Sequence, residues 1–595
     1  MKLTVYNGSE ELHIEAQPEN TLLAAMVGGG VFVDAPCGGG GKCGKCRVLA
    51  TGPLTPLTEE EQSLLSPEDR AAGVRLACCA RPLGDVTVMM APQQAVHVQT
   101  AAAGGRETLR PSVRRVAVAV PAATLAAQRD DCARVSDALT AAGVLAVGWT
   151  LTARRHAPAA LRERDGRISA VLYGSRLLDV AADAPLTGLA LDIGTTTVVA
   201  YFYDLETGVQ LCVQSGLNPQ RAFGADVITR IAACAEPDGL AKLQRAVVGL
   251  LARLIESFCS DTGRPAASIY HVTVAANTTM LHLLAGIDPK NIAGAPFISA
   301  TLFGFDLPAR ELGLPVCPDA PVTLLPSISS YVGADIVAGL TRCGLDRCTE
   351  RVVYIDIGTN GEMAYCGGAG APLLCCSTAA GPAFEGAHIR CGTGGVPGAI
   401  SSVRLDNHTV VFDTIGGAAP VGLCGSGLID AIAVLLRIGA IDETGRMADP
   451  EELDAPFCDG LNEEGDFVFD YTRGILLTQQ DVREVQLAKA AICAGILTML
   501  HTAGVSVGQV DRVVLAGGFG AHIDPDNACA IGLLPPETAG RVEIVGNAAG
   551  LGAVSALLNA ESLVRMRALA ADCRYIELSG DPFFQDAYVE QMLFA

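Results

Sequence analysis

The chain has 595 residues, of which 50% are hydrophobic and 18% are charged, a composition that excludes a largely disordered protein and predicts several globular domains. The formal net charge of −22 excludes a nucleic-acid-binding role, because phosphates require a basic surface. No apolar run reaches the length of a membrane span, residues 1–4 do not begin a signal peptide, and the 21 cysteines are thinly spread. We therefore expect a cytoplasmic protein with reduced thiols and no membrane contact.

Residues 1–92 predict a small domain of alternating strands and short helices. Asn7-Gly8 is a preferred hairpin turn, Asn20 can cap a helix over residues 21–27, and Thr58 with Glu61 forms a capping box. The helix that this box opens is expected to end near residue 65. Strands are expected at residues 2–6, 11–16, 45–50 and 86–90.

Cysteines on a glycine-rich loop are the strongest chemical signal in this domain. Cys37, Cys43 and Cys46 lie on the loop, and Cys78 follows an Arg-Leu-Ala run with Cys79 beside it. Glycines let such a loop bend around a cluster, and the spacing is one residue longer than the plant-type ferredoxin pattern. The resemblance to 2Fe–2S ferredoxins implies a β-grasp fold and a 2Fe–2S cluster on the first three cysteines and Cys78, with Cys79 as the open alternative. Structural or zinc-binding thiols are disfavoured because only one short Cys-x-x-Cys hook is present.

A linker and a second small domain are expected next. Residues 93–112 are rich in small and polar residues, lack periodicity and predict a linker. Residues 113–185 predict a small α/β domain, for which a spacer or dimerisation role is expected because no catalytic group is recognisable there. Its strands are expected at residues 113–120, 144–152 and 168–174, and a helix over residues 122–142 that stops at Gly143.

Residues 186–595 contain an internal duplication. Asp192 and Asp356 each end an apolar strand, are followed by a Gly-Thr turn, and precede a second strand. Such a hairpin tip can present N–H groups and hydroxyls to phosphate oxygens, while the carboxylate holds Mg²⁺ through its waters. The phosphate-binding residues are expected to be Gly194, Thr195, Thr196, Thr197, Gly358, Thr359 and Asn360.

A third motif follows a predicted strand near the C-terminus. The strand that ends at Ala516 runs directly into glycines, where the backbone can approach a nucleotide closely. Its nucleotide-binding residues are expected to be Gly517, Gly518, Phe519 and Gly520.

The three motifs together resemble the actin-like ATPase superfamily. This resemblance implies a duplicated, ribonuclease H-like α/β domain with subdomains at about residues 186–345 and 346–595. The order of ferredoxin, linker, middle domain and actin-like domain resembles the reductive activators of corrinoid proteins. Further stretches that resemble this family are Asn218-Pro-Gln220, Gly224-Ala-Asp226, Ala276-Asn-Thr-Thr279, Gly381-Pro-Ala-Phe-Glu385-Gly and Leu578-Ser-Gly-Asp-Pro582.

The resemblance implies an ATP-hydrolysing electron-transfer activator that binds ATP and Mg²⁺. Its partner would be a corrinoid protein of a methyltransferase or O-demethylase system, whose Co(II) is returned to Co(I) by an electron from the 2Fe–2S cluster. The cluster would in turn be reduced by an upstream electron donor, and the family implies a homodimer. Asp192 and Asp356 would be the catalytic residues that hold Mg²⁺ and its waters.

Other residues are assigned by the resemblance, with alternatives open. Glu385 could orient the attacking water, or it could serve as a cap or ion-pair partner. Gly425-Ser426-Gly427, ahead of a helix expected to begin near Leu428, could donate N–H groups to the nucleotide or form a tight turn. Gln486 and Lys489 lie on one helix face, and superfamily members clamp the adenosine from such a helix.

Two other functions compete with this reading. One is an activator of another low-potential metalloenzyme, as the 2-hydroxyacyl-CoA dehydratase activators are. The other is a redox-sensing regulator in which the cluster gates an ATP-binding module. Cobalt reduction with and without ATP distinguishes all three.

Overall fold

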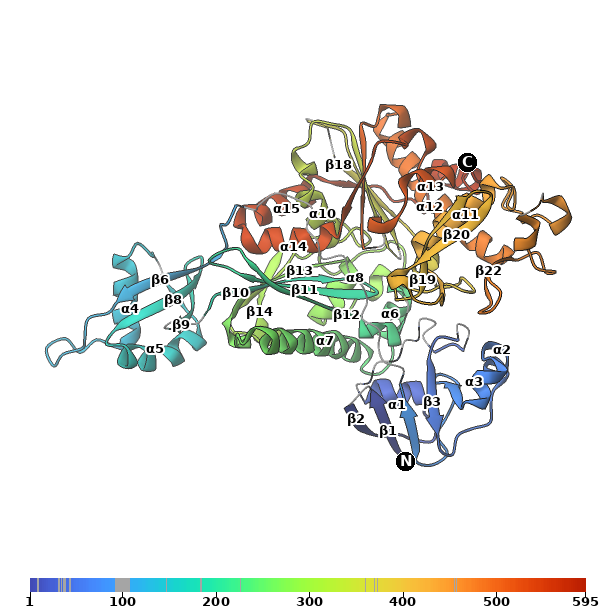
Figure 1. Cartoon of the computed structure of the whole chain (residues 1–595). Coiled ribbons are helices and arrows are strands. Elements are labelled where there is room, and N and C mark those ends of the chain that lie inside the picture. The colour runs from blue at the N-terminus through green and yellow to red at the C-terminus, as the bar shows by residue number, and fades with distance from the viewer. Residues whose placement is uncertain are drawn as a thin grey trace.

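The computed structural model describes residues 1–595 except 8–9, 30, 32, 34, 36–38, 42–43, 91–107, 146, 182–184, 225, 359, 369, 372, 454, 456 and 519. A small domain that contains the N-terminus lies below the rest of the molecule, and a second small domain projects to the left (Figure 1). Two larger halves, each built on a six-stranded sheet, form the centre.

The N-terminal domain is a five-stranded sheet with strand order β2-β1-β5-β3-β4. β1 pairs with β5 in parallel, and the other neighbouring strands pair antiparallel. This arrangement is the expected β-grasp fold. Its elements are β1 (Lys2–Asn7), β2 (Glu10–Glu15), α1 (Leu22–Gly28), β3 (Arg47–Thr51), α2 (Glu59–Leu64), α3 (Pro67–Ala71), β4 (Val74–Leu76) and β5 (Val86–Met89).

Helix caps in this domain partly follow the prediction. The capping box of Thr58 and Glu61 is present at the start of α2. The cap predicted for α1 was wrong, because Thr21 and not Asn20 accepts the hydrogen bond from the Ala24 N–H, at 3.1 Å. The strand predicted at residues 45–50 begins two residues later. The expected turn at residues 7–8 lies partly outside the described residues.

The middle domain is a four-stranded sheet, β6-β8-β9-β7, with two helices. The helix predicted within residues 122–142 is shorter, because Asp130 caps it and accepts from the Ala133 N–H at 2.9 Å. The strand predicted at residues 144–152 was wrong beyond Trp149, since Thr150 caps a helix that the sequence analysis missed. The elements are β6 (Val113–Ala119), α4 (Asp131–Ala141), β7 (Gly148–Trp149), α5 (Leu151–Glu163), β8 (Arg167–Tyr173) and β9 (Arg176–Ala181).

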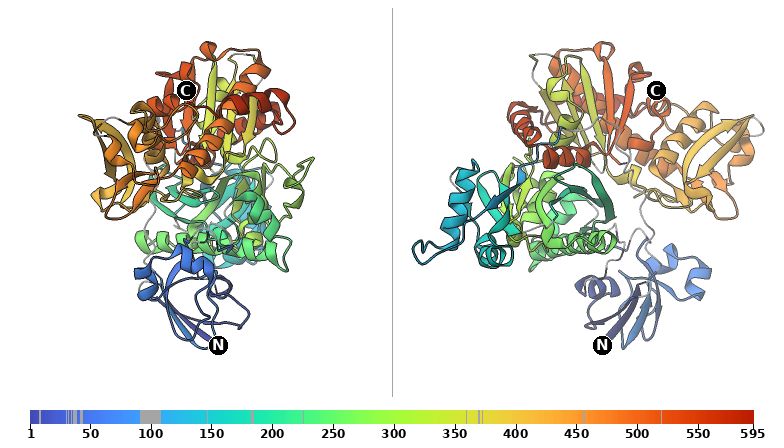
Figure 2. Two further views of the ribbon diagram at one scale, coloured as in Figure 1. Left: turned by 90° about the vertical axis from the view of Figure 1, so that its right-hand side faces the viewer. Right: turned by 60° about the vertical axis from the view of Figure 1, so that its left-hand side comes forward.

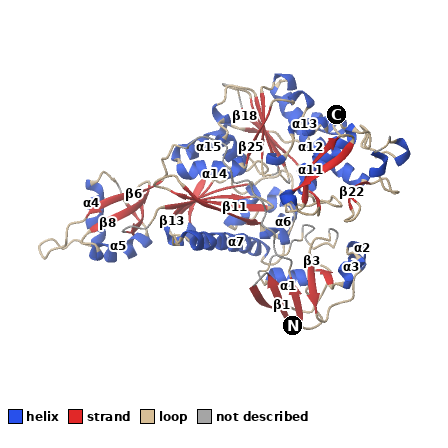
Figure 3. Cartoon of the chain, viewed as in Figure 1, coloured by secondary structure: helices blue, strands red, loops and turns tan. Residues whose placement is uncertain are grey.

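The lower central half has the sheet order β12-β11-β10-β13-β15-β14. Its strands are β10 (Thr187–Ile193), β11 (Thr197–Asp204), β12 (Gln210–Leu217), β13 (Ile269–Ala276), β14 (Phe305–Pro308) and β15 (Pro321–Leu324). Its helices are α6 (Val227–Ala233), α7 (Gly239–Thr262), α8 (Thr278–Ala285), α9 (Ala309–Leu312) and α10 (Ala334–Arg342). The long α7 covers the lower face of the sheet (Figure 3).

The upper central half repeats this plan with the sheet order β25-β24-β16-β17-β18-β26. Its strands are β16 (Val352–Ile357), β17 (Gly361–Cys366), β18 (Leu373–Thr378), β24 (Arg512–Ala516), β25 (Val542–Gly546) and β26 (Arg574–Tyr575). In both halves an antiparallel hairpin is followed by a third antiparallel strand on one side and a parallel strand on the other. The duplication predicted from the sequence is therefore a duplication of sheet topology, as expected of an actin-like fold.

Helices and an inserted layer complete the upper half. Its helices are α12 (Gln479–Ala503), α13 (Pro525–Ala530) and α16 (Pro582–Glu590). The inserted layer contains β19 (Ala399–Asp406), β20 (Thr409–Thr414), β21 (Gly422–Leu423), α11 (Gly425–Arg437), β22 (Phe467–Asp470) and β23 (Ile475–Leu477). Among the described helices, α12 alone is long and apolar enough to span a membrane, but 78% of its apolar window is buried, as in a core helix.

Two helices from near the C-terminus belong to the core of the lower half. They are α14 (Ala548–Leu558) and α15 (Ala560–Asp572), and their buried residues lie in the same hydrophobic cluster as the lower sheet. α14 and α10 approach so closely that a Cβ on Gly552 would overlap the carbonyl of Ala338. The lower half is thus completed by chain from the end of the sequence, which ties the two halves together.

Candidate functional site

The two predicted hairpin tips differ by one residue. In β10–β11 the Gly194 N–H donates to the Thr197 carbonyl at 2.9 Å, whereas in β16–β17 the Gly358 N–H donates to the Asn360 carbonyl at 3.0 Å. The strand partners that flank the tips confirm this difference, since four residues separate the last pair in the first copy and three in the second. Thr359 lies outside the described residues. The first tip is therefore one residue longer than the second.

Asp192 and Asp356 stand at corresponding positions on β10 and β16, and both are partly buried. Burial raises the pKa of Asp192 to about 6, partly offset by a hydrogen bond from Asn547. Burial and the nearby charge of Asp192 raise the pKa of Asp356 to about 7. The two carboxylates, one from each half, therefore lie close enough for the charge of Asp192 to act on Asp356.

Two further acidic side chains, which the sequence analysis missed, join this pair. Asp335 lies in the first turn of α10, and burial with the charge of Asp356 raises its pKa to about 7. Glu362 on β17 is the direct cross-strand partner of Asp356, and burial with the charges of Asp335 and Asp356 raises its pKa well above the usual range. We call Asp192, Asp335, Asp356 and Glu362 the carboxylate cluster. Buried carboxylates of like charge need a cation or protons nearby.

The carboxylate cluster does not form a complete metal cage. In the part of the chain that the structure describes, no three His, Cys, Asp or Glu side chains are arranged to hold a metal ion by themselves. Mg²⁺ suits such a site, because it keeps several of its waters and is commonly bound by one or two carboxylates together with substrate phosphates.

The first hairpin tip is held from behind by polar side chains of the lower half. Asn218 Nδ2 donates to the Gly194 carbonyl at 2.8 Å, and Arg230 Nη2 donates to the Thr195 carbonyl at 2.6 Å. Asn277 Nδ2 reaches the Thr195 hydroxyl at 3.3 Å. Asn218 and Asn277, which belong to two of the stretches that resemble the corrinoid-activator family, thus contact the first hairpin tip directly. Arg230 links the tip to a third stretch, because its Nε donates to the Gly224 carbonyl at 2.9 Å. Arg230 is almost fully buried, and burial lowers its pKa to about 9.

Glu385 reaches the same tip from the other half. It ends a 3₁₀ turn (Pro382–Glu385), and its Oε2 accepts a hydrogen bond of 2.7 Å from the Thr196 hydroxyl. Its charge also acts on buried Arg230. The side chain thus bridges the two halves at the first hairpin tip.

The Gly-rich turn after β24 lies against the carboxylate cluster. Gly517 has a φ of +94°, and a Cβ there would lie 2.5 Å from Asp356 Oδ1. The Gly517 N–H donates to the Gly546 carbonyl at 3.1 Å, directly before Asn547. Only glycine meets both requirements at this position. Gly518 and Gly520 continue the turn, and Phe519 lies outside the described residues.

The Gly425-Ser426-Gly427 segment was predicted to precede its helix, and this placement was wrong. α11 begins at Gly425, so the three residues form its buried first turn. Ser426 Oγ donates to the Ser401 carbonyl at 2.8 Å, and a Cβ on Gly427 would overlap the Ile400 carbonyl. These contacts favour the tight-turn alternative, because close packing on β19 already explains the small residues.

Gln486 and Lys489 lie on the same face of α12, but their polar atoms bind the C-terminal segment of the chain. Gln486 Nε2 donates to the Met592 carbonyl at 2.7 Å, and Lys489 Nζ donates to the Leu593 carbonyl. The Lys489 ammonium also lies 5.3 Å from the centre of the Phe594 ring, and burial lowers its pKa to about 8. These contacts assign both residues to holding the C-terminus and give no support to an adenosine-binding role.

The described cysteines of the N-terminal domain converge. Cys46 Sγ and Cys78 Sγ are 3.3 Å apart, and both residues are buried. Cys79 Sγ lies 3.6 Å from Cys78 Sγ and is more exposed. Arg75 holds this turn through two hydrogen bonds of 2.8 Å to the buried carboxylate of Glu61. Cys37 and Cys43 lie outside the described residues.

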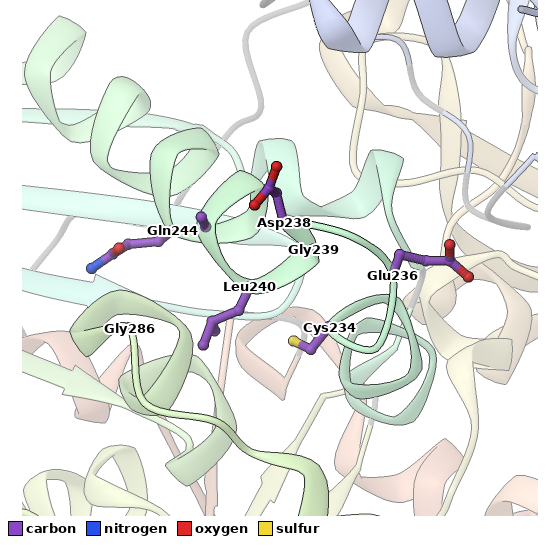
Figure 4. A pocket seen from close by; sticks show the side chains of 8 residues that line it. Cys234, Glu236, Asp238, Gly239, Leu240, Gln244 and Gly286 are labelled. Carbon is purple, nitrogen blue, oxygen red and sulfur yellow. The ribbon is translucent and has the colours of Figure 1, made fainter.

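A surface pocket of about 320 Å³ lies at the start of α7, and no residue of the carboxylate cluster lines it (Figure 4). Cys234, Glu236, Asp238 and Gln244 are among its lining residues. It contains none of the residues predicted from the sequence, and we assign it no role in nucleotide binding.

Several residues of the site carry recognisable signals that sequence reasoning missed. Glu362 is a carboxylate in an otherwise apolar strand, paired with Asp356 across a short hairpin. Asp335 is an acidic residue in the first turn of a nearly apolar helix. Asn547 caps α14 directly after β25, the strand that pairs with β24 ahead of the Gly-rich turn. Its side chain accepts a hydrogen bond from the Gly550 N–H. Only the fold brings Asp335 and Asn547 near Asp192, and Glu362 near Asp335.

Family models match nearly the whole chain. The matches are a 2Fe-2S iron-sulfur cluster binding domain at residues 5–83, the RACo linker region at 106–184, the RACo middle region at 187–348, and the C-terminal domain of RACo, the ASKHA domain, at 350–595.

Known proteins match over comparable lengths. The corrinoid activation enzyme RamQ of Eubacterium limosum is 38% identical over 72% of this chain and 74% of its own length. The [Co(II) methylated amine-specific corrinoid protein] reductase of Methanosarcina barkeri is 25% identical over 58% of this chain and 66% of its own. A solved structure titled as a reductive activator for corrinoid, iron-sulfur protein superposes with a TM-score of 0.74 at 32% identity, covering 100% of this chain and 98% of that one. The chain therefore belongs to the RACo family of corrinoid activators, with a 2Fe–2S domain followed by a duplicated ASKHA domain.

Proposed function

We propose that the protein is an ATP-dependent reductive activator of a corrinoid protein, which transfers one electron from a 2Fe–2S cluster to Co(II) and so regenerates Co(I). The names of the relatives support a corrinoid partner. The observation that carries the proposal is the combination, in one chain, of a 2Fe–2S domain with two facing phosphate-type hairpins around a carboxylate cluster.

Energetics explain why such a chain needs both parts. A plant-type ferredoxin has a reduction potential of about −400 mV, and a corrinoid Co(II) is harder to reduce than that. For a one-electron transfer, each 59 mV of shortfall disfavours the product by about tenfold. Nucleotide binding or hydrolysis can offset the shortfall if it changes how the activator holds its partner's two redox states.

The cluster is proposed to bind to Cys37, Cys43, Cys46 and Cys78. The contact between the Cys46 and Cys78 sulfurs supports this choice, because two thiols of one metal site must converge in this way. Cys79 is more exposed than Cys78. When bound, the cluster supplies a one-electron carrier. The buried pair of Arg75 and Glu61 fixes the turn that presents Cys78.

The nucleotide is proposed to bind between the hairpin tips as Mg²⁺·ATP. Residues 194–197 and 358–360 would hold its phosphates, and Asp192 and Asp356 would hold Mg²⁺ through its waters. The raised pKa values of these buried carboxylates support a cation there. We add Asp335 and Glu362 to this set, and assign Gly517, Gly518, Phe519 and Gly520 to close approach of the nucleotide.

Glu385 is proposed to orient the attacking water. Its hydrogen bond with Thr196 supports the role, because that bond holds one carboxylate oxygen at the first phosphate loop. An upstream electron donor, a cytoplasmic location and a homodimer complete the proposal.

The proposal is tested by following the optical spectrum of a corrinoid protein from a methyltransferase system under anaerobic conditions. The full chain, reduced chemically, should convert Co(II) to Co(I) only when ATP and Mg²⁺ are present. Cys46→Ala should abolish the conversion and retain nucleotide binding, whereas Asp356→Asn should retain the cluster absorbance and lose ATP hydrolysis. Full conversion by the Cys46→Ala variant would contradict the electron-transfer role.

A further inference from the structure

Lys45 precedes Cys46 on the glycine-rich loop of residues 37–46, which we call the cluster loop. Its side chain contacts a segment more than three hundred residues away in the sequence. Its Nζ donates to the carbonyl of Gly386 at 2.9 Å and to the carbonyl of Gly392 at 3.2 Å. The N-terminal domain lies beneath β19 and α6 in Figure 1 and remains below the two central halves in both views of Figure 2. This contact therefore joins the cluster loop to the ATPase domain.

The two acceptor carbonyls belong to one tight loop, residues 386–392. Gly386 has a φ of +77°, and a Cβ there would lie 2.5 Å from the Thr393 nitrogen. The Gly392 N–H donates to the Ile389 carbonyl at 3.0 Å, and the Thr393 N–H donates to the Leu423 carbonyl at 2.8 Å. The loop is thus fixed on the inserted layer, with two carbonyls directed at one ammonium group.

The same loop continues directly from the nucleotide site. Gly386 follows Glu385, whose carboxylate accepts the hydrogen bond from Thr196 on the first hairpin tip. Lys45, Gly386, Glu385 and Thr196 therefore form a continuous series of contacts. One end lies next to a cluster cysteine and the other lies in the first phosphate loop.

We propose that the cluster loop docks onto the 386–392 loop through Lys45, so that the 386–392 loop is an interaction surface for the chain's own ferredoxin domain. Occupancy of the phosphate loop would then shift Glu385 and change how firmly the cluster loop is held. By linkage, docking would change nucleotide affinity by the same factor. The docking contact stands on the geometry alone, whereas its link to the nucleotide rests on the proposed function.

The docking is tested by hydrogen–deuterium exchange on the cluster-loaded full chain without nucleotide. Lys45→Met removes two hydrogen bonds from a charged group, which should lower the equilibrium constant for docking by at least about tenfold and speed exchange in peptides spanning residues 386–393. Lys2→Met is the matched control, since Lys2 is an exposed lysine of the same domain, at the start of β1 and outside the cluster loop. It should leave exchange in these peptides unchanged.

A second variant covers the case in which Lys45→Met loses its cluster. Gly386→Ala should distort the acceptor loop from the ATPase side and speed exchange at residues 39–47, with the iron content retained. Wild-type exchange rates at residues 386–393 in a cluster-loaded Lys45→Met variant, or at residues 39–47 in Gly386→Ala, would overturn the docking.

The link to the nucleotide is tested by adding a non-hydrolysable ATP analogue with Mg²⁺. It should change exchange at residues 39–47 in the wild type and not in Lys45→Met. Analogue bound in equilibrium dialysis with no change in the wild type would overturn the link. Analogue that fails to bind at all would contradict the proposed function instead, and the nucleotide-free comparison would still decide the docking.

Discussion

Asn547 Nδ2 donates a 2.7 Å hydrogen bond to Asp192 Oδ2, although the two residues lie near opposite ends of the ATPase domain in sequence. Asp192 is the penultimate residue of β10 in the lower sheet, whereas Asn547 follows β25 of the upper sheet and caps α14. The contact fixes one member of the carboxylate cluster with a group from the other half. It also lowers the pKa of Asp192 against the opposing effect of burial.

Replacing Asn547 should therefore change the pH dependence of ATP hydrolysis. Without the amide donor the pKa of Asp192 rises above about 6, so a higher pH is needed to deprotonate it. We expect Asn547→Ala to lose about 10- to 100-fold in ATPase rate at pH 7 and to recover part of it at higher pH. Asn559→Ala, which removes the cap of α15, is the control and should keep the wild-type profile. An unshifted profile in Asn547→Ala would show that the contact does not act on the carboxylate.

The choice between Cys78 and Cys79 gives a paired prediction. Cys78→Ala should lose the iron and the visible absorbance of the cluster, because Cys78 Sγ is the thiol beside Cys46 Sγ. Cys79→Ala should retain both, with at most a small shift in the spectrum. The measurement is iron content and absorbance of anaerobically purified protein. The opposite pattern would transfer the fourth ligand to Cys79.

The raised pKa of Asp335 predicts that the free energy of unfolding of the protein depends on pH. Its pKa is raised from about 4 in the unfolded chain to about 7 in the fold, so the folded protein binds more protons between these values. The stability of the nucleotide-free protein should accordingly fall as the pH rises from about 4 to about 7, and then level off. Asp335→Asn removes one of the repelling charges, so its melting temperature at pH 8 should exceed that of the wild type by a few degrees.

The same variant should lose nucleotide chemistry. If Asp335 supports Mg²⁺, Asp335→Asn should lower the ATPase rate by about 10- to 100-fold at saturating nucleotide. Asp288→Asn replaces an exposed carboxylate and should change neither quantity. A lower melting temperature for Asp335→Asn at pH 8 would contradict the like-charge account.

Replacing Lys489 distinguishes a structural role of this residue from a role in adenosine binding. Its ammonium binds the Leu593 carbonyl and faces the Phe594 ring, so Lys489→Met should lower the stability by about 1–3 kcal/mol through the freed C-terminal segment. The dissociation constant for Mg²⁺·ADP should change by less than about threefold. Lys242→Met, on the exposed face of α7, serves as the control. A tenfold larger dissociation constant for Mg²⁺·ADP in Lys489→Met, at unchanged stability, would restore the adenosine assignment.

Local sequence signals predicted the parts of the fold that local chemistry determines. The two Asp-x-Gly-Thr turns indicated hairpins because each lies between apolar strands, and both hairpins are present with the expected pairing. The capping box of Thr58 and Glu61 was predicted from the Thr-x-x-Glu spacing, and it is present at the start of α2. The second helix of the middle domain was missed, because residues 144–152 read as an apolar strand until the Thr150 cap is recognised.

Long-range contacts were beyond such signals. Asp335 and Glu362 join the carboxylate cluster only because α10 and β17 meet there, and nothing in their own neighbourhoods fixes that meeting. Gln486 and Lys489 were placed correctly on one helix face, but the chain's own C-terminus occupies their polar atoms. The Lys45 contact crosses between domains and has no sequence signature.

The most direct test of the central claim is the rate of Co(II) reduction measured with and without ATP on the same reduced, cluster-loaded protein and its corrinoid partner. We predict that Mg²⁺·ATP raises the yield of Co(I) by at least about tenfold, which corresponds to roughly one 59 mV step. The Asp356→Asn variant should keep its cluster and show no such increase. Equal rates and yields of Co(I) with and without ATP would contradict the account, because electron delivery would then be independent of the ATPase domain.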